Sequence, residues 1–346
     1  MARRRFEKFD ESLKAGQETE KGKQGTFSKV EVVKVRKLDA SLGSVYSLQY
    51  SMDGRFLAAG FQNGSIQLLS STTGELKKDL RKTRHGGYPI MSLKFHPKDH
   101  SILFAGTSEG LVYAINIETG DFQTICTETG NEINCIDFDS EGYNFATAGK
   151  DLAVRIYDLK TYQLEREYSG YDEKTPNEQV CLGNTSRAFA LKYHPEFNHI
   201  FITGGWDNNI KIWDSRRNDG VVRIISGPHI CGDAIDISKH HILTGSWCAN
   251  HALQVWNYTD GDLNKNVTFP HKGNGAFLYC AQMCDNNVVL AGGSGTNSAK
   301  AIDVKTDTCL GEVEMKKPVQ ALDSTLGGRM FAVGGSDDCI ILASLS

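Results

Sequence analysis

Short runs of alternating apolar and polar residues recur along most of this chain, separated by turns rich in Gly, Asp and Asn. Each unit has an alternating strand, a turn, a strand of small residues that ends near Gly, a second turn, and a strand that ends in Asp or Asn. A period of two is typical of β-strands, and Gly and Asx residues favour tight turns. The pattern predicts an all-β fold of short antiparallel strands.

The unit occurs seven times, and its clearest copy runs from Ala190 to Asp214. The small residue that closes the second strand marks each copy: Gly60, Gly106, Ala148, Gly204, Gly245, Gly292 and Gly334. The steps between these residues are 41 to 47, except for one step of 56 that contains a polar insertion at about 170–187. A period of roughly 40–45 residues with four short strands per unit is the spacing of propeller blades.

The third strands of the units carry a family resemblance. Trp213-Asp214 follows Gly204-Gly205-Trp206-Asp207, and the equivalent places hold Trp256-Asn257, Tyr157-Asp158, Ile302-Asp303 and Ile115-Asn116. With these dipeptides, residues 30–346 resemble the WD-repeat β-propeller family. The resemblance implies an all-β, seven-bladed β-propeller of four-stranded antiparallel blades. The Gly-His dipeptide that precedes each blade in that family is missing here.

The two ends of the chain predict how the ring closes. The last unit supplies three strands and stops at Ser346, whereas an unassigned strand at Val30–Leu38 precedes the first unit. We expect this N-terminal strand to complete the last blade, which removes an exposed edge. Residues 1–29 are polar and charged, so we expect a flexible basic N-terminal extension on a single domain that spans 30–346. The extension carries a net charge of +3, which leaves −7 for the rest.

Composition narrows the cellular setting. The 346 residues are 40% hydrophobic, enough for a large core, with a net charge of −4. No run reaches the roughly 18 apolar residues of a membrane span, and the first residues lack the apolar segment of a secretory signal. The nine cysteines are odd in number and lie mostly in apolar runs, which is typical of reduced thiols. We expect a cytoplasmic protein, with the nucleus left open.

Catalytic motifs are weak in this sequence. Gly16 and Gly22-Lys23 are separated by five residues, one more than in a phosphate-binding loop, and Gly292-Gly293-Ser294-Gly295 is not a nucleophile elbow. The inner strands are interpreted as mainly apolar and small, without converging acid, base or nucleophile groups. We therefore expect no enzyme, no catalytic residue and no cofactor.

A metal site is also considered. The side chains that could form one are His229, Cys231, Cys248 and His251, with His240 and His241 between them. Zinc ligands normally include tight Cys-x-x-Cys spacings, which are absent here, so we expect ordinary loop and strand residues and no metal. Cys280 and Cys284 lie on one face of a strand and are interpreted as core thiols.

Acidic and amide residues recur at the turn between the second and third strands, at Asn63, Asp151, Asp207 and Asp337. Repetition favours a structural role, because Asx side chains in tight turns bind their own backbone.

Surface recognition is the remaining class of function. Candidate protein-binding residues lie beside these turns or in loops that lead into the inner strands: Trp206, Lys150, Trp247, Tyr88, Arg187 and Phe277. A Trp at such a turn is either a plug between blades or an anchor for a partner, since Trp and Arg dominate binding hot spots.

Two basic elements are candidates for an acidic partner surface. They are Arg3, Arg4 and Arg5 in the extension, and Lys77, Lys78, Arg81, Lys82 and Arg84 near an outer strand. The alternative is a solvated edge strand, whose Lys residues discourage edge-to-edge pairing. Nucleic-acid binding is not favoured, because no aromatic platform is interleaved with the charges.

The sequence thus predicts a non-enzymatic scaffold or adaptor that docks proteins on the propeller faces within a larger intracellular assembly. One alternative is a cytoskeletal component, associated with microtubules or an axoneme, whose basic tail binds an acidic polymer. A propeller enzyme with a channel active site is the other alternative.

Overall fold

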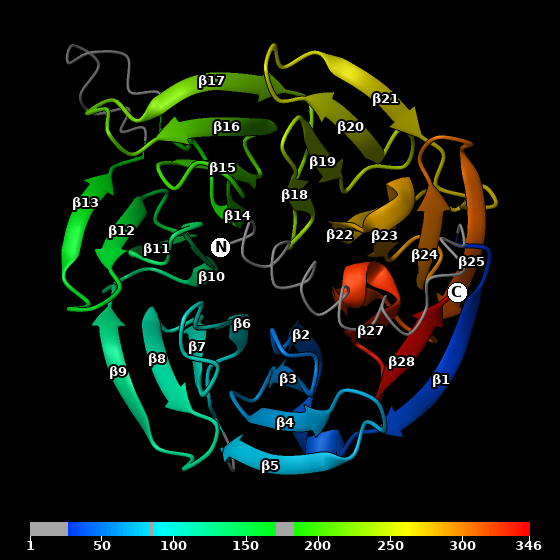
Figure 1. The fold of residues 1–346 in the computed structure, drawn as a ribbon, viewed down its shortest axis with the longest axis horizontal. Coiled ribbons are helices and arrows are strands. Elements are labelled where there is room, and N and C mark those ends of the chain that lie inside the picture. Colours follow the sequence, from blue (N-terminus) through cyan, green and yellow to red (C-terminus); the bar gives the residue numbers. More distant parts are fainter. Residues whose placement is uncertain (1–26, 84–85, 171–182) are drawn as a thin grey trace, which may run out of the picture.

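Seven four-stranded antiparallel sheets stand as blades around a ring in the computed structural model, which describes residues 27–83, 86–170 and 183–346 (Figure 1). The strands of blades 1 to 6 follow sequence order from the centre to the rim, as in β2-β3-β4-β5. The predicted seven-bladed propeller is therefore confirmed. The helices of the described residues are the short 3-10 turns η1 (Ala40–Leu42), η2 (Asp285–Asn287) and η3 (Leu326–Gly328). None of the described helices has the length and apolar character needed to cross a bilayer.

Four consecutive strands make each of blades 1 to 6. Blade 1 contains β2 (Val45–Tyr50), β3 (Phe56–Phe61), β4 (Ile66–Ser70) and β5 (Leu76–Arg81); blade 2 contains β6 (Ile90–Phe95), β7 (Ile102–Thr107), β8 (Leu111–Asn116) and β9 (Phe122–Thr127). Blade 3 contains β10 (Ile133–Phe138), β11 (Asn144–Gly149), β12 (Val154–Asp158) and β13 (Leu164–Tyr168); blade 4 contains β14 (Ala188–Tyr193), β15 (Ile200–Gly205), β16 (Asn209–Asp214) and β17 (Val221–Ser226). Blade 5 contains β18 (Ile235–Ile237), β19 (His241–Gly245), β20 (Leu253–Asn257) and β21 (Leu263–Val267); blade 6 contains β22 (Leu278–Met283), β23 (Val288–Gly293), β24 (Ser298–Asp303) and β25 (Thr308–Glu314).

Blade 7 joins the two ends of the chain. Its strands are β26 (Val319–Thr325), β27 (Met330–Gly335), β28 (Cys339–Leu345) and, at the rim, β1 (Val30–Lys37). β1 pairs antiparallel with β28, from Val30 opposite Leu345 to Lys37 opposite Cys339. The N-terminal strand therefore completes the last blade, as the sequence predicts.

Contacts with the ring begin before β1. The backbone N–H groups of Ser28 and Lys29 donate to the carbonyl of Ser346, at 2.6 and 3.0 Å. The Phe27 ring is buried in the core of blade 7 and lies under the guanidinium of Arg329, at 5.8 Å. The described contacts thus start three residues before the boundary expected at 29/30, while residues 1–26 lie outside the described ranges.

The hydrophobic core lies between neighbouring blades. Every residue of β4 is buried, whereas most of β5 is at least partly exposed, because a middle strand is covered on both faces and a rim strand is not. The repeated small residues let the blades approach one another. A Cβ atom on Gly60 would lie 2.7 Å from the Ile90 side chain of the next blade.

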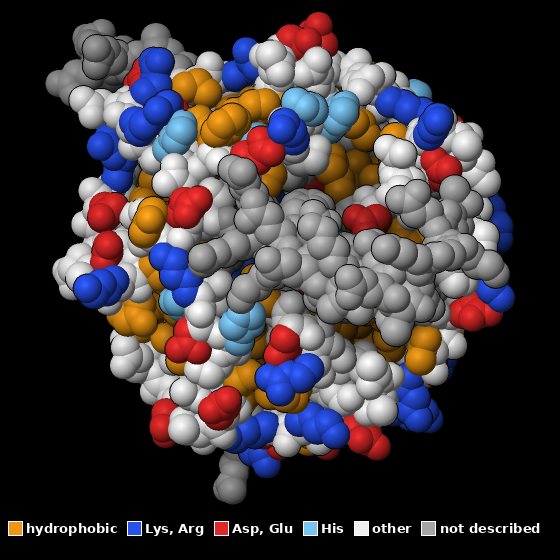
Figure 2. Space-filling view, viewed as in Figure 1, with side chains coloured by type: hydrophobic (Ala, Val, Ile, Leu, Met, Phe, Trp, Pro, Cys, Tyr) orange, Lys and Arg blue, Asp and Glu red, His pale blue; other side chains and the backbone are white. Residues whose placement is uncertain are grey.

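One face of the ring is shown in Figure 2. Lys and Arg side chains are interspersed with Asp and Glu around its rim, and hydrophobic side chains lie between them. The visible described part of this face therefore carries no broad field of a single charge.

The contacts of residues 27–37 predict graded effects of truncation. Removal of residues 1–26 should leave the melting temperature nearly unchanged. Removal of 1–29 should lower it by several degrees, because burial of a Phe side chain contributes about 1.5–3 kcal/mol. Removal of 1–37 should abolish soluble expression, because blade 7 then loses its rim strand. Soluble yield is compared for the three variants, and thermal unfolding is measured for those that are soluble. Equal yield and equal stability of the first and last variants would contradict the closure by β1.

Candidate functional site

Trp206 is exposed at the turn between β15 and β16, at the end of the ring where the inner strands begin. Its side chain is 45% exposed, although the ring packs on Phe189 of β14 with centroids 5.2 Å apart. The indole N–H donates to the Cys231 sulfur at 3.1 Å, and the Arg187 guanidinium lies 4.9 Å from the ring centroid. Contacts with Phe189, Cys231 and Arg187 hold the indole in place at the surface.

Trp247 forms a second exposed aromatic pair on blade 5. Its side chain is 41% exposed, the Phe277 ring lies 5.1 Å away, and the indole N–H donates to the Tyr279 hydroxyl at 2.9 Å. This pair is also fixed by contacts from the neighbouring blade 6.

Phe277 has a strained backbone. Its φ angle is +48°, in the left-handed region that a bulky residue seldom adopts and that costs about 1–2 kcal/mol. Its N–H donates to the carbonyl of Cys248, and its own carbonyl accepts from Ser294, both at 3.0 Å. Gly275 is required beside it, because a Cβ there would lie 2.5 Å from the Phe277 ring. Strain of this kind concentrates at functional sites, which makes the loop that leads into β22 a candidate.

The segment 229–232 connects the two aromatic pairs. Cys231 accepts from Trp206, the carbonyl of His229 accepts from the N–H of Trp247, and Gly232 lies against the backbone of Tyr279. The two aromatic pairs therefore lie on neighbouring blades and are joined through this segment. We call these rings, together with Tyr279, the aromatic arc: Phe189, Trp206, Trp247, Phe277 and Tyr279.

Basic side chains lie at the blade 3 end of the aromatic arc. Arg187 and Lys150 share the carboxylate of Glu132, with N–O distances of 3.2 and 2.6 Å. The Lys150 hydrogen bond and the nearby Arg187 charge lower the pKa of Glu132, so this carboxylate stays ionised at neutral pH. Sequence reasoning proposed Arg187 and Lys150 separately, and the structure joins them through Glu132.

The centre of the ring, where the seven inner strands meet and which we call the channel, is more polar than the sequence interpretation stated. Seven inner-strand residues that pair at equivalent positions with the second strands are polar or charged: Gln49, Lys94, Asp137, Lys192, Asp236, Gln282 and Asp323. The inner strands are otherwise mainly apolar and small, as expected, but the expectation overlooked this one polar or charged position in each strand. These residues were not recognised as one ring from the sequence, because each is a single polar residue in a strand far along the chain from the others. Their equivalent position in each repeat was the signal that could have revealed the ring.

Carboxylates of this polar ring bind the backbone of the following blade. Asp323 accepts from the N–H of Tyr50 at 2.6 Å, Asp137 from Tyr193 at 2.7 Å, and Asp236 from Met283 at 2.8 Å. Asp323 also accepts from the side-chain amides of Gln49 and Gln282. These three carboxylates therefore join blades 7 to 1, 3 to 4 and 5 to 6.

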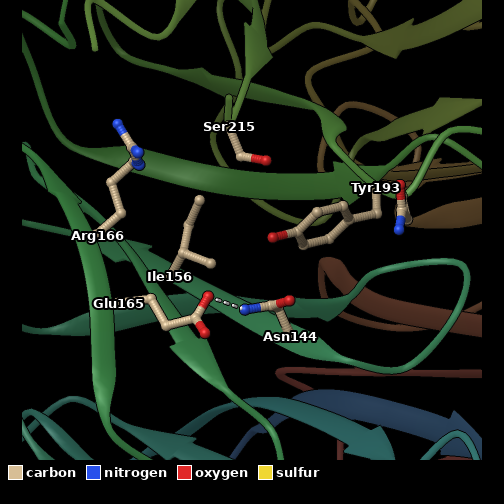
Figure 3. Close-up of a pocket in the computed structure, with 7 residues that line it drawn as sticks. Asn144, Ile156, Glu165, Arg166, Tyr193 and Ser215 are labelled. Carbon is tan, nitrogen blue, oxygen red and sulfur yellow. Dashed lines mark hydrogen bonds between the residues drawn. The ribbon is translucent and has the colours of Figure 1, made fainter. Parts of the chain in front are cut away.

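A polar cleft lies between blades 3 and 4 (Figure 3). Asn144 donates to the Glu165 carboxylate (Figure 3). Arg166 donates to the backbone carbonyl of Arg217. Burial, with the nearby Asp139 and Asp137, raises the pKa of Tyr193 well above its usual value, so its hydroxyl keeps its proton. The lining does not pair a nucleophile with a base, and the aromatic arc is the stronger candidate.

The turn residues make local hydrogen bonds. Asn63, Asp151 and Asp207 each accept from the N–H two residues further along, with distances of 2.8, 3.2 and 3.3 Å. Asp337 accepts from the N–H groups of Asp338 and Lys316. The local bonds satisfy backbone donors in the turns, as an Asx turn does, whereas the bond from Lys316 joins Asp337 to the loop before β26.

The other predicted binding residues lie apart from the aromatic arc. Tyr88 is half-exposed in the loop that leads into β6 of blade 2. In blade 1, Lys77 pairs with Glu75 and Lys82 with Asp79, while Lys78 donates to the carbonyl of Glu118 and Arg81 to that of Gly64. These contacts occupy the basic side chains locally and leave both the acidic-partner and the edge-strand interpretations as predictions. Arg3, Arg4, Arg5 and Arg84 lie outside the described residues.

Three of the six side chains considered for zinc bind other groups. His229 pairs with Asn208 at 2.6 Å, Cys231 accepts from Trp206, and Cys248 donates to the carbonyl of Asn250 at 3.1 Å. Burial raises the pKa of the Cys231 and Cys248 thiols, which keeps them protonated. The eight cysteines in the described ranges are free thiols.

Three blades contain a buried hydrogen-bond chain that the sequence did not reveal. The indole of Trp213 donates to Thr203, whose hydroxyl donates to Asn184, and Trp256 donates to Thr244 in blade 5. In blade 3, the buried Glu128 accepts from Tyr157, Thr147 and Arg155. Asn184 comes from the predicted insertion, so the end of that segment belongs to the blade. Residues 171–182 lie outside the described ranges.

Comparison with known protein families finds two β-propeller models that match this chain. The family model described as the nucleolar protein 10-like N-terminal domain, a β-propeller, matches residues 92–307, and the model of the Vps8 β-propeller matches residues 28–142.

Three curated relatives are similar over about two thirds of the chain. "Cilia- and flagella-associated protein 52" of Sus scrofa is 24% identical, and the match covers 66% of this chain and 34% of that protein. "Cell division cycle 20.1, cofactor of APC complex" of Arabidopsis thaliana is 24% identical, with 64% of this chain and 46% of that protein covered. "WD repeat-containing protein 18" of Mus musculus is 23% identical, with 67% of this chain and 54% of that protein covered. The match spans about a third to a half of each relative's length.

The four tryptophans give a direct measure of the aromatic arc. Trp213 and Trp256 are buried, whereas Trp206 and Trp247 are half-exposed. Acrylamide should therefore quench about half of the emission in the intact chain. Substitution of both Trp206→Phe and Trp247→Phe should leave a blue-shifted, poorly quenched emission. Unchanged quenching in this double variant would contradict the exposure of the two indoles.

Proposed function

Because the chain belongs to the WD-repeat β-propeller family, we propose that it is a non-enzymatic scaffold that docks protein partners within a larger assembly, and that the aromatic arc is its docking surface. A rigid ring loses little conformational entropy when its loops bind a partner. The fold alone does not identify the partner.

One observation carries this proposal. Two half-exposed tryptophans are held in fixed positions, and the strained Phe277 completes one of the two pairs. Exposed aromatic rings with restricted motion are typical of binding hot spots, because they bury apolar area at low entropic cost. Backbone strain at Phe277 lowers the stability of the fold, and its ring packs on the exposed Trp247. A role of this ring in docking a partner explains why the strain is present.

The channel supports the non-enzymatic part of the proposal. Its carboxylates Asp137, Asp236 and Asp323 accept backbone hydrogen bonds from neighbouring blades. A catalytic base must be available to a substrate proton, whereas these groups hold the ring together.

A substitution pair tests the docking surface. The Trp206→Ala/Trp247→Ala chain should lose its principal protein partners by about thirtyfold or more, because a Trp hot spot contributes roughly 2 kcal/mol or more. Quantitative affinity purification from cells measures the loss. Phe122→Ala/Tyr143→Ala is the matched control, because both of these aromatic side chains are exposed outside the arc. The control variant should keep its partners bound. Retention of every partner by the Trp variant would refute docking at the arc.

A second candidate function is a structural component of the cytoskeleton. It is favoured by the similarity to cilia- and flagella-associated proteins, and by the basic composition of residues 1–29. The basic segment would bind an acidic polymer surface by long-range attraction, which salt screens.

Co-sedimentation with microtubules tests this candidate. The intact chain should pellet at low salt and be released at about 0.5 M salt, where charge attraction is largely screened. A chain that lacks residues 1–26 should stay in the supernatant at both salt concentrations. Equal sedimentation of the two chains would assign the binding to the propeller instead.

A further inference from the structure

The rim strand β1 leaves the outer edge of blade 7 without a neighbouring strand. The sheet order β1-β28-β27-β26 places β1 at the outside of the blade, and Figure 1 shows it along the outer wall of the ring. The side chains of Val32, Val33 and Val35 are each about half-exposed. Among the other rim strands, β17 has two exposed large apolar side chains and the rest have at most one. An apolar edge of this kind favours the addition of a further strand.

The pairing of β1 with β28 determines which backbone groups face the outer edge. Lys29 precedes β1 and Ser346 follows β28, and these two residues exchange two backbone hydrogen bonds of 3.0 Å. Bonded and non-bonded residue pairs alternate along an antiparallel ladder. The N–H and C=O groups of Val30 and Val32 therefore point outward, away from β28.

A β-bulge reverses this alternation in the middle of β1. The ladder steps from Val32 directly to Lys34, which leaves Val33 as the extra residue. Beyond the bulge, the N–H of Leu38 donates to the carbonyl of Asp338 at 2.8 Å, so the groups at odd-numbered positions now point outward. The outward backbone groups of β1 thus belong to Val30, Val32, Val35 and Lys37.

A second copy of β1 matches this arrangement. When two copies run antiparallel with Val32 opposite Val35, each strand supplies the same two residues between the two Val pairs. The bulges then face each other and the ladder stays in register, although a bulge offsets the pairing with a straight strand. The same register places Val30 opposite Lys37, so all the outward backbone groups of the two strands meet.

The side chains also fit in this register. The β28 partners of Val32 and Val35 are two residues apart, so these side chains share one face of the sheet and pack on each other across the two copies. Glu31 and Arg36 lie on the other face, where the register places Glu31 of one copy opposite Arg36 of the second. They form a non-bonded pair, in which side chains approach most closely. Twofold symmetry repeats both contacts.

Glu31 and Arg36 are available for this ion pair. Glu31 contacts Lys29 at 2.5 Å, but both side chains are more than half-exposed, so this pair contributes little. Nη1 of Arg36 donates to the carbonyl of Gly74 at 3.0 Å, which fixes the position of the guanidinium.

We propose that this chain forms a symmetric homodimer through β1, with Val32 opposite Val35 and Glu31 opposite Arg36 of the second copy. The two copies of blade 7 then form one eight-stranded sheet. This edge lies apart from the aromatic arc of blades 4, 5 and 6, so it is an interaction surface beyond the proposed docking function. β17 contains Arg223 but no acidic residue, so a symmetric pair of β17 gains no ion pair.

Charge and size limit the strength of the dimer. Residues 30–37 carry one acidic and three basic side chains, a net charge of +2, and basic side chains on an edge oppose pairing. A single strand pair is also small compared with the roughly 1,200–2,000 Å² of a stable interface. We therefore expect association in the micromolar range.

Sedimentation velocity of the full chain tests the dimer. Between about 1 and 200 μM, the weight-average mass should rise from that of one chain toward that of two. Val32→Lys/Val35→Lys should weaken association about tenfold or more, because it places further positive charges opposite one another in the ladder. Val222→Lys/Ile224→Lys makes the same change on β17 and should leave association unchanged. All four native side chains are exposed, so thermal unfolding should show that both variants keep the fold.

Exchange of the charged pair tests the register. Glu31→Arg and Arg36→Glu should each weaken association about threefold to tenfold, because each places like charges opposite one another. The Glu31→Arg/Arg36→Glu chain restores opposite charges and should recover most of the association. A double variant that keeps the fold but associates no better than the single variants would overturn the proposed pairing.

Three other results would also overturn the inference. A chain that stays monomeric throughout the concentration range would leave the edge without a second copy. Dimers that persist unchanged in the Val32→Lys/Val35→Lys variant would assign the association to another surface. Loss of the dimer on removal of residues 1–26 alone would assign the edge to that segment of a second copy.

Discussion

β1 and β28 lie at opposite ends of the chain, and their antiparallel pairing closes the ring. Each blade buries its faces against two neighbours, so a blade without its rim strand would weaken both adjoining interfaces. The contacts of Phe27 and Ser28 extend this junction, and the Asp323 carboxylate joins blade 7 to the backbone of blade 1 at the channel. Closure therefore combines a strand ladder at the rim with charged hydrogen bonds at the centre.

A closed ring gives the loops at its ends fixed positions. The aromatic arc is assembled from blades 4, 5 and 6, so its geometry exists only when these blades are packed. The strain at Phe277 is supported in the same way, by a hydrogen bond that it donates to the carbonyl of Cys248 and one that it accepts from the N–H of Ser294, in two different blades. Charged groups in the channel and aromatic groups at its end thus have separate roles: the first hold the blades together, and the second present a surface.

The blades use different residues for one buried hydrogen-bond arrangement. Trp213 and Trp256 donate to a Thr of the second strand, while in blade 3 the phenol of Tyr157 and the hydroxyl of Thr147 converge on Glu128. The repeats are degenerate in sequence because the requirement is a satisfied buried donor, which several residue types meet. The period and the apolar pattern could be predicted, but Asn184 and Glu128 could not, since they lie outside the dipeptides that mark the family.

Local chemistry determined what the sequence revealed: the alternation of the strands, the Asx residues of the turns, the seven small residues, the unassigned N-terminal strand and the last unit of only three strands. Tertiary packing alone decided which exposed residues meet. Arg187, Lys150 and Trp206 come together through Glu132 and Phe189, whereas Tyr88, chosen on the same positional grounds, lies on another blade. Strand and turn patterns arise from neighbours in sequence, but a surface patch arises from side chains of different blades, and their relative placement depends on how the sheets pack around the ring.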